Sequence, residues 1–445
     1  MSSPDPDSYN KINDVSVEKI ILKSEQGGSV DISSLVMHVD LYEDLTSPIL
    51  KGQMKVVDAI GFRTHLPLLG TESVEISFKT PGIGSKLITT RLDVMSMTGR
   101  TKKLDDRSEI YELGLRSRNH FYNESRRVSR AYEGKISDMV AQIAKEYLPE
   151  VNVEVEETRG NYKFVIPNLR PLDAIRFLST KAVSAQGPHD SNYILFETLG
   201  SLVFASIGRL SNGQTMKEYH SKLSSIDDGT DKIRREFLKI QDIQIKEDFD
   251  TESDLRSSMM SSRLMSHDLT TKSIKILSYN HQLDFDKSNH VESNRELPFK
   301  SRYTVMGDGK TVLLTRQEQA YGQNFDNSEY ESEYLKSLSN RMSWRGNSIL
   351  ITVAGDSTLR AGMVVGLSLP SNEPKKSNDP DWFDKYGSGR YLITSIRHGI
   401  LNTSGKEYTN MMELSRDSLP VQPPDEKKFL GSSKEDERPD SSLFA

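Results

Sequence analysis

Residues 15–118 alternate between apolar and polar side chains, and this period of two limits the possible folds more than any other feature of the chain. Successive residues of a strand point to opposite faces of a sheet, so the alternation predicts half-buried strands. Clusters of Gly, Ser, Asp and Pro separate the alternating segments, as expected of turns. Short strands at this spacing predict an antiparallel sandwich or barrel. The alternating segments are residues 17–22, 30–32, 36–39, 54–57, 74–78, 92–97 and 111–115.

The period changes near residue 133. Apolar residues recur at helical spacing from Ile136 to Tyr147, and Pro149 ends the predicted helix. Alternating valines at residues 151–155 then predict a strand. The block from about residue 119 to 210 is therefore expected to mix helices and strands.

A second helix is predicted to begin at Pro171, since proline suits the first helical position, where an N–H group has no partner. Leu172, Ile175 and Leu178 fall on one face, and the helix is expected to run to Ala185. Two short apolar runs follow, at residues 192–197 and 202–205. Gly200 lies in the break between them, which predicts a β-hairpin.

The rest of the chain gives a second set of strand patterns. Residues 211–236 are polar and are interpreted as a loop or linker, and residues 281–327 are polar and mixed. Helices are expected at residues 254–268 and 329–343. Further strands are expected at residues 237–245, 273–277, 349–353, 364–369, 391–396 and 408–414, and residues 419–445 form a tail without a core of its own.

An internal duplication is indicated between residues 66–118 and 359–416. The sequence Val-Glu-Ile at residues 74–76 aligns with Val-Gly-Leu at 365–367. In both blocks a strand that starts at an arginine follows, Arg91 in the first and Arg390 in the second. Each block then closes on Ser-Arg, at residues 117–118 and 415–416. Compositional similarity between β-sandwich segments is the alternative explanation.

Composition restricts the function classes that the chain can fill. Its 445 residues predict more than one domain. Apolar residues make up 35%, or about 41% with the 28 glycines, against ~45–50% in average domains. This balance fits elongated domains or surfaces shared between subunits. The net charge of −6 argues against electrostatic affinity for nucleic acid. A weakly acidic protein surface would let DNA slide past without binding. No run is long enough for a membrane helix, so no membrane insertion is expected.

Several motifs were weighed as sites of chemistry. The chain has no cysteine, which excludes disulfides, thiolate metal sites and cysteine nucleophiles. Residues 307–311 read Gly-Asp-Gly-Lys-Thr but lack the earlier glycine of a phosphate loop, since Thr304 stands there. They are interpreted as a β-turn. Residues 248–254 resemble a calcium loop without its glycine and its final glutamate, and are interpreted as a helix N-terminus.

Two clusters of charged residues were interpreted as solvated. His281, Asp284, Asp286 and His290 form the densest group of possible metal ligands, and a solvated loop is the favoured interpretation. The strongest basic stretch is either a strip that faces DNA or a partner, or a solvated linker that leaves the first barrel and is balanced by Glu124 and Glu133. The linker is favoured. This stretch consists of Arg116, Arg118, Arg126, Arg127 and Arg130.

No catalytic, cofactor-binding or metal-binding residue is therefore assigned, no cofactor is expected, and an enzyme is not expected. A Gly-x-Ser-x-Gly elbow does not occur in the sequence. Interface residues cannot be named from the sequence.

The order of barrel, α+β insert with helix and hairpin, and second barrel resembles the central baseplate hub subunit of contractile-tailed phages. It is similar in fold to the N-terminal part of type VI secretion spike proteins. The specific part of the resemblance is residues 170–205 and the strands of residues 362–414. The chain departs from the secretion spikes in having no needle region after residue 416.

The resemblance implies a virion protein of the tail baseplate, assembled in the host cytoplasm. It implies a homotrimer around a DNA channel, joined to the tail tube above, to a spike protein below and to other baseplate proteins, with DNA passing through unbound. Three copies of a chain with two equivalent barrels would give a ring of near sixfold symmetry. The C-terminal tail is a candidate tether to the spike.

The expected fold class is α+β, mainly β, with two antiparallel β-barrel (tube) domains that flank and interleave with smaller α+β insert domains. The expected domains are a flexible N-terminus (1–14), a first barrel (15–118), an α+β insert (119–236), a second barrel (237–280 and 344–416), an insert with a helix (281–343) and a flexible C-terminal tail (417–445). The alternative functions are a cell-wall (peptidoglycan) hydrolase and a glycan-binding tail protein.

Overall fold

The computed structural model describes most of the chain between residues 12 and 422. The described ranges are 12–61, 68–82, 85–102, 108–186, 190–221, 232–247, 250–257, 259–296, 309–316, 325–326, 330–344, 347–371 and 383–422. Most of the expected flexible termini, residues 1–11 and 423–445, lies outside these ranges.

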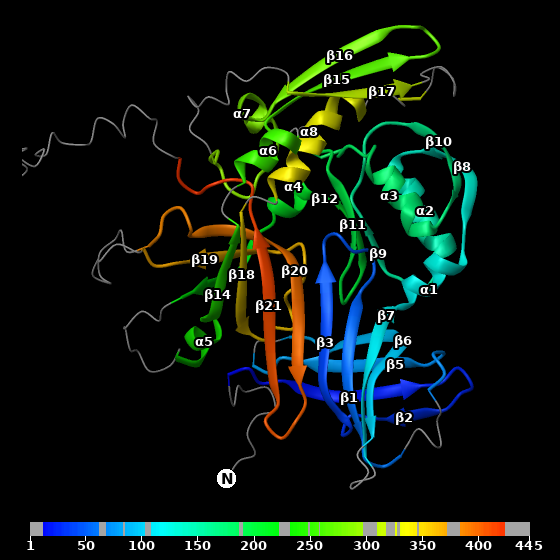
Figure 1. Ribbon diagram of the computed structural model, residues 1–445, viewed down its shortest axis with the longest axis vertical. Helices are drawn as coiled ribbons and strands as arrows, with labels where there is room; N and C mark the ends of the chain where they lie inside the picture. Colours follow the sequence, from blue (N-terminus) through cyan, green and yellow to red (C-terminus); the bar gives the residue numbers. More distant parts are fainter. Residues whose placement is uncertain are drawn as a thin grey trace, which may run out of the picture.

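The alternating N-terminal residues form the expected antiparallel strands, which we call the N-terminal module (Figure 1). Its strand order is β3-β4-β7-β6-β5-β1-β2. Alternation places one face of each strand in the core, as β4 shows with buried Gly52, Met54 and Val56. The strands are β1 (Ser16–Lys23), β2 (Ser29–Asp31), β3 (Val36–Asp44), β4 (Lys51–Asp58), β5 (Ser73–Lys79), β6 (Ile88–Lys102) and β7 (Glu109–Ser117).

A second set of strands, the C-terminal module, has the order β14-β18-β21-β20-β19, and β13 pairs parallel with β19. Its core holds Ile349, Ile351 and Val353 of β18 together with buried residues of β19, β20 and β21. The strands are β13 (Thr215–His220), β14 (Ile240–Glu247), β18 (Ser348–Ala354), β19 (Val364–Ser368), β20 (Gly389–Leu401) and β21 (Glu407–Ser415).

The two modules share one topology, which confirms the duplication. Strands β3-β4-β7-β6-β5 correspond to β14-β18-β21-β20-β19, and every neighbouring pair in both series is antiparallel. Arg91 pairs with Glu75, and Arg390 pairs with Gly366, as the sequence alignment requires. The closing Ser-Arg pairs are offset by one residue in this alignment.

Matching irregularities fix the correspondence of residues 36–41 with 240–245 and of residues 91–98 with 390–397, and further bulges in β14 and β6 lie beyond these stretches. The β3–β4 ladder shifts register between Val36 and His38, and the β14–β18 ladder shifts between Ile240 and Asp242. The β6–β7 ladder shifts between Val94 and Ser96, and the β20–β21 ladder does so between residues 393 and 395. A bulge inserts one residue into one strand of a pair, so a shared bulge marks equivalent positions.

The expected two closed barrels are not found among the described residues. Instead, β20 pairs with β3, so both modules belong to one 13-stranded sheet whose path ends at β14 and β2. In Figure 1 the sheet twists so that β1 and β5 run across the direction of β3 and β21. The mainly-β, α+β class is confirmed, and the correction arises because the edge of one module is the partner of the other.

The first insert is α+β as expected. It contains α1 (Arg118–Ser125), β8 (Val128–Gly134), α2 (Ile136–Tyr147), β9 (Val153–Val155), β10 (Tyr162–Leu169), α3 (Pro171–Ser179), β11 (Tyr193–Glu197), β12 (Leu202–Ser206) and α4 (Ile207–Ser211). The predicted helix at α2 and the hairpin of β11 and β12 are confirmed, and the hairpin reaches down beside β3 (Figure 1). Helix α3 is shorter than predicted because Ser179 and Thr180 hydrogen-bond back to helix carbonyls and the helix ends there.

Helix α5 (Lys232–Phe237) lies near β14, and the remaining elements lie toward the top of Figure 1, away from β1 and β2. They are α6 (Thr251–Ser257), β15 (Ser261–Asp268), β16 (Ile274–Asn280), α7 (His281–Asp284), the 3₁₀ helix η2 (Phe285–Lys287), β17 (Lys310–Arg316) and α8 (Tyr330–Ser343). Strands β15, β16 and β17 form a small separate sheet against α8. The predicted helix at α8 is confirmed.

Three sequence interpretations need correction here. The helix expected at residues 254–268 is α6 followed by β15, because serines such as Ser266 take the inward strand positions and hydrogen-bond to α8 through Glu331 (2.8 Å). The linker of residues 211–236 includes β13, and the strand expected from residue 237 begins at Ile240 after α5. Asp417 and Ser418 are buried, so the chain remains packed beyond residue 416.

Candidate functional site

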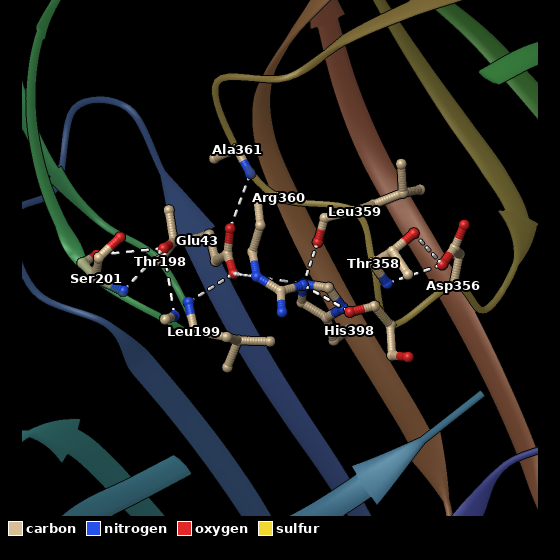
Figure 2. Close-up of polar contacts among 12 residues, drawn as sticks. Glu43, Thr198, Leu199, Ser201, Asp356, Thr358, Leu359, Arg360, Ala361 and His398 are labelled. Carbon is tan, nitrogen blue, oxygen red and sulfur yellow. Dashed lines mark hydrogen bonds and ion pairs between the residues drawn. The ribbon is translucent and has the colours of Figure 1, made fainter. Parts of the chain in front are cut away.

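Glu43 joins three parts of the chain through one carboxylate (Figure 2). It lies in β3 opposite Ile396 of β20, and only 1% of it is exposed. Its Oε1 accepts a hydrogen bond from the backbone N–H of Leu199 (2.9 Å), at the turn of the insert hairpin. Its Oε2 accepts one from the N–H of Ala361 (2.8 Å), in the loop between β18 and β19. A buried carboxylate needs such donors, and here they tie the N-terminal module, the insert and the C-terminal module together.

Two cationic or ionisable groups face the same carboxylate. Arg360 Nε and His398 Nε2 each lie 3.7 Å from Glu43 Oε1, which is ion-pair range but too long for a hydrogen bond. Both side chains point toward Glu43 in Figure 2. Of the two, the Arg360 guanidinium supplies the positive charge that compensates the buried carboxylate.

The tautomer of His398 follows from its neighbours. The Tyr408 hydroxyl lies 2.6 Å from His398 Nδ1, and burial raises the pKa of Tyr408 above its ordinary value, so this hydroxyl stays protonated and can donate. The Asn410 amide nitrogen lies 3.0 Å from the same Nδ1, and its oxygen accepts from the N–H of Asp356, which fixes its orientation. Nδ1 is therefore the acceptor, and neutral His398 carries its proton on Nε2, facing Glu43.

The loop from Gly355 to Ala361 is held from two sides. Asp356 is fully buried, pairs with Lys217 of β13, and accepts hydrogen bonds from the N–H and hydroxyl of Thr358 (2.8 and 2.7 Å). Ser357 and Thr80 exchange hydrogen bonds of 2.9 and 3.1 Å. Thr80 directly follows β5, so these hydrogen bonds also attach the loop of the C-terminal module to the N-terminal module.

A second buried carboxylate, Glu197, ends β11. It accepts hydrogen bonds from the Leu50 N–H (2.8 Å), the Ser117 hydroxyl (2.5 Å) and the Asn119 amide (2.7 Å). Burial raises the pKa of Glu197 to about 7. The insert hairpin is thus anchored to the N-terminal module at its strand end by Glu197 and at its turn by Glu43.

This arrangement positions backbone, since Glu43, Glu197 and Asp356 each accept hydrogen bonds from backbone N–H groups. We call the set of Glu43, Glu197, Asp356, Arg360 and His398 the polar junction. The sequence analysis missed it. One sequence signal was available. Glu43 follows Val39 and Leu41 at a spacing of two, so it lies on the same face of the strand as these apolar residues, which is the face toward the core.

The motifs weighed earlier lie away from this junction. Lys310 and Thr311 begin strand β17, where a phosphate loop would begin a helix, so the turn interpretation agrees with the described part of the motif. Residues 301–308 lie outside the described ranges. Asp250 accepts the Ser253 N–H at the start of α6, which confirms the helix N-terminus. Within the described ranges, no group of three or more His, Asp or Glu side chains could hold a metal ion.

The histidine cluster is not a solvated loop, and that interpretation is corrected. His281 and His290 are buried in α7 and after η2, because Phe285 stacks on His290 with ring centroids 3.7 Å apart. His290 Nδ1 pairs with Asp417 at 2.8 Å. Burial lowers the pKa of His281 to about 4. Asp286, by contrast, is largely exposed.

The basic stretch is also more ordered than a linker. Arg118 binds Asp93 through Nε and Nη2, and Arg130 pairs with Glu146 (3.0 Å). Arg126 donates to the Tyr147 carbonyl (2.8 Å). The two acids that were expected to balance this stretch pair with other residues. Glu124 pairs with Arg170, and Glu133 pairs with Lys163. The stretch packs the start of the first insert.

Comparison with solved structures places this fold. The tail protein from Neisseria meningitidis MC58 matches with a TM-score of 0.50 and 11% identity, over 91% of this chain and 99% of that one. The 43 kDa tail protein of prophage MuSo2 from Shewanella oneidensis matches with a TM-score of 0.52 and 10% identity, over 90% and 99%. The chain shares the fold of these tail proteins.

The likeness confirms the resemblance at the level of fold. No known protein-family profile matches the sequence, and no curated protein does. Among the described helices, none has both the length and the apolar character needed to cross a bilayer.

Proposed function

We propose that the chain is the structural hub subunit of a contractile-tail baseplate. In this proposal three copies form a ring around a DNA channel, which connects a hexameric tail tube to a cell-puncturing spike. Its place is the virion baseplate, after assembly in the host cytoplasm.

The observation that carries the proposal is the pair of modules with one strand order in one polypeptide. Three copies present six such modules, and a ring of six can abut a hexameric tube. The fold shared with two proteins described as tail proteins agrees with this role. The net charge of −6 suits a channel that does not retain DNA.

The polar junction has a defined purpose in such a ring. A hub transmits force between tube and spike, so its two modules must keep a fixed relative position. Buried, hydrogen-bonded polar groups such as Glu43 at the β3–β20 seam specify that position more uniquely than apolar contacts do. The proposal includes no catalytic role.

Sedimentation velocity and negative-stain imaging of the purified protein test the proposal. A trimer at micromolar concentration, seen as a ring with an open bore, is the expected result. A monomer at these concentrations would contradict it. A peptidoglycan turbidity assay and a glycan array test the alternative functions, and the proposal predicts no clearing and no glycan binding.

A further inference from the structure

Strand β14 carries apolar side chains that no described residue covers fully. Within the described ranges, β14 pairs only with β18, and its other edge faces outward. Ile243 and Ile245 point to the core side of the sheet, since they lie opposite the buried Ile351 and Ile349. They are nevertheless 38% and 57% exposed. The described residues therefore leave the core of the C-terminal module open at this edge.

The equivalent residues of the N-terminal module are covered. The shared bulges align Ile243 with Val39 and Ile245 with Leu41 of β3. Val39 is 1% exposed and Leu41 is fully buried. The outer edges of the two strands differ. β3 pairs with β20 along residues 38–44, whereas β14 has no described partner strand at its outer edge.

Strand β6 corresponds to β20, and along half of its length β6 has one edge without a described partner strand. β20 uses residues 389–392 for β19 and residues 395–401 for β3. β6 likewise uses residues 88–93 for β5, and Val94 still bonds Glu72. From Met95 to Lys102, however, the described ladder continues only on the β7 side. This open half of β6 occupies the place where β20 receives its partner.

We infer that β14 of one copy pairs antiparallel with the open half of β6 of a second copy, and so repeats between subunits the β3–β20 joint found within each chain. The inference rests on the proposed ring and names its subunit contact. The two edges belong to different surfaces, so the contact is head-to-tail, which is the type of contact that a closed ring of identical subunits requires. Closure would also remove the two exposed edges, which a soluble protein otherwise has to protect.

The internal joint fixes the register of the proposed one. Tyr42 lies opposite Arg397 in the β3–β20 ladder. Tyr42 pairs with Lys51 of β4, and Glu247 pairs with the equivalent Ser348 of β18, since Lys246 is the extra residue of a second bulge in β14. The pair therefore becomes Glu247 opposite Thr98 across the subunit contact. Met97 takes the place of the buried Ile396, next to the uncovered isoleucines of β14. Directly opposed residues of antiparallel strands have Cα atoms about 4.5–5.5 Å apart, within reach of a disulfide.

Engineered disulfides test the contact against a clean background, because the chain has no cysteine. The double variant E247C/T98C is oxidised with copper phenanthroline and run on a non-reducing gel. We expect covalent species up to a trimer, and a mixture of the two single variants should stop at a covalent dimer. Each single variant alone should give no cross-link, and a dimer from either one would contradict the head-to-tail contact.

Sedimentation of the unmodified and reduced proteins separates the two levels of failure. A trimer that does not cross-link through these positions would overturn the β14–β6 contact and leave the ring intact. A protein that sediments as a monomer would overturn the ring and the contact together.

A charge substitution gives a second, independent readout. Ile245→Asp should weaken the trimer at least tenfold without lowering the melting temperature of the isolated subunit, because Ile245 is exposed there. Ile276→Asp is the matched control, since Ile276 is a strand residue that is 56% exposed on the separate β15–β16–β17 sheet. Equal weakening by both variants, or by neither, would contradict the inference.

Discussion

Leu41 and Ile245 occupy the same position in two copies of one module, yet Leu41 is fully buried and Ile245 is more than half exposed. Because the two modules share one topology, the exposure of a residue in one module can be compared with that of its equivalent in the other. A position that is buried in one module and exposed in the other is where we expect the proposed subunit contact. Within the chain, the two modules are joined where β3 pairs with β20, and the polar junction fixes their relative position there.

Glu43→Ala should destabilise the protein by about 3 kcal/mol or more, because it leaves the N–H groups of Leu199 and Ala361 buried without an acceptor. It also leaves Arg360 without its counter-ion. Urea denaturation followed by circular dichroism measures the change. Glu146→Ala, which removes an exposed ion pair with Arg130, is the control and should cost less than about 1 kcal/mol. Similar losses in both variants would show that Glu43 does not hold the seam.

Glu197 should make the folded state less stable as the pH rises toward 7. Burial raises the pKa of its carboxyl to about 7, above the ordinary value of 4.5, so the folded state holds this proton more tightly than the unfolded state. Its contribution is therefore fully present below about pH 4.5 and is lost as the pH rises through about 7.

Glu197→Gln removes this titration while keeping an acceptor oxygen. Each pKa unit corresponds to about 1.4 kcal/mol, so the variant should gain up to roughly 3 kcal/mol relative to the wild type between pH 4.5 and pH 8. Urea midpoints measured across this range provide the test. A difference that does not vary with pH would mean that the carboxyl titrates normally.

Gly355→Ala should destabilise the protein by about 1–3 kcal/mol through overpacking. A Cβ at Gly355 would meet the Tyr408 ring, which is fully buried and hydrogen-bonded to His398 and therefore cannot move aside. Gly405→Ala is the matched control, because a Cβ there meets no atom within 4 Å. Thermal unfolding of both variants measures the difference, and equal melting temperatures would indicate that the loop is packed less closely than described.

Asp417→Asn should cost about 3–5 kcal/mol near pH 6, since it breaks a buried pair with His290. Burial lowers the pKa of His290, but the Asp417 carboxylate outweighs burial and raises it overall. Burial raises the pKa of Asp417, and His290 outweighs this and lowers it overall.

The sign of the pH dependence follows from these two shifts. The stabilisation by His290 is present below its unfolded pKa of about 6.5 and is lost as the pH rises through the higher folded value. That of Asp417 is present above about pH 4 and is lost as the pH falls through the lower folded value. The cost of the substitution should therefore be largest between about pH 4 and pH 6.5. A cost that grows steadily above pH 8 would contradict a charged pair.

The sequence predicted the strands and the duplication because both depend on local alternation. The Val74–Ile76 and Val365–Leu367 segments needed only a repeated pattern to be aligned. The fusion of the modules could not be predicted in this way, since the pairing of β3 with β20 joins residues more than 350 positions apart and leaves no local mark.

The polar junction was missed for a related reason. Glu43, Arg360 and His398 are ordinary as single residues and become a site only when three distant segments meet. Strand β15 was mistaken for a helix because its inward face is lined partly by serines, whose partners on α8 replace the apolar contacts that sequence patterns detect. Residues for the proposed subunit contact could be named only when the two modules were compared in three dimensions.

The insertion of α6, β15–β17 and α8 between β14 and β18 also determines the order in which the modules can form. During translation, β14 leaves the ribosome about one hundred residues before β18, while β3 and β4 emerge almost together. At roughly 5–20 residues per second, β14 waits several seconds for its partner. The N-terminal module is then already able to fold on the nascent chain and to offer β3 as a template on which the later strands assemble.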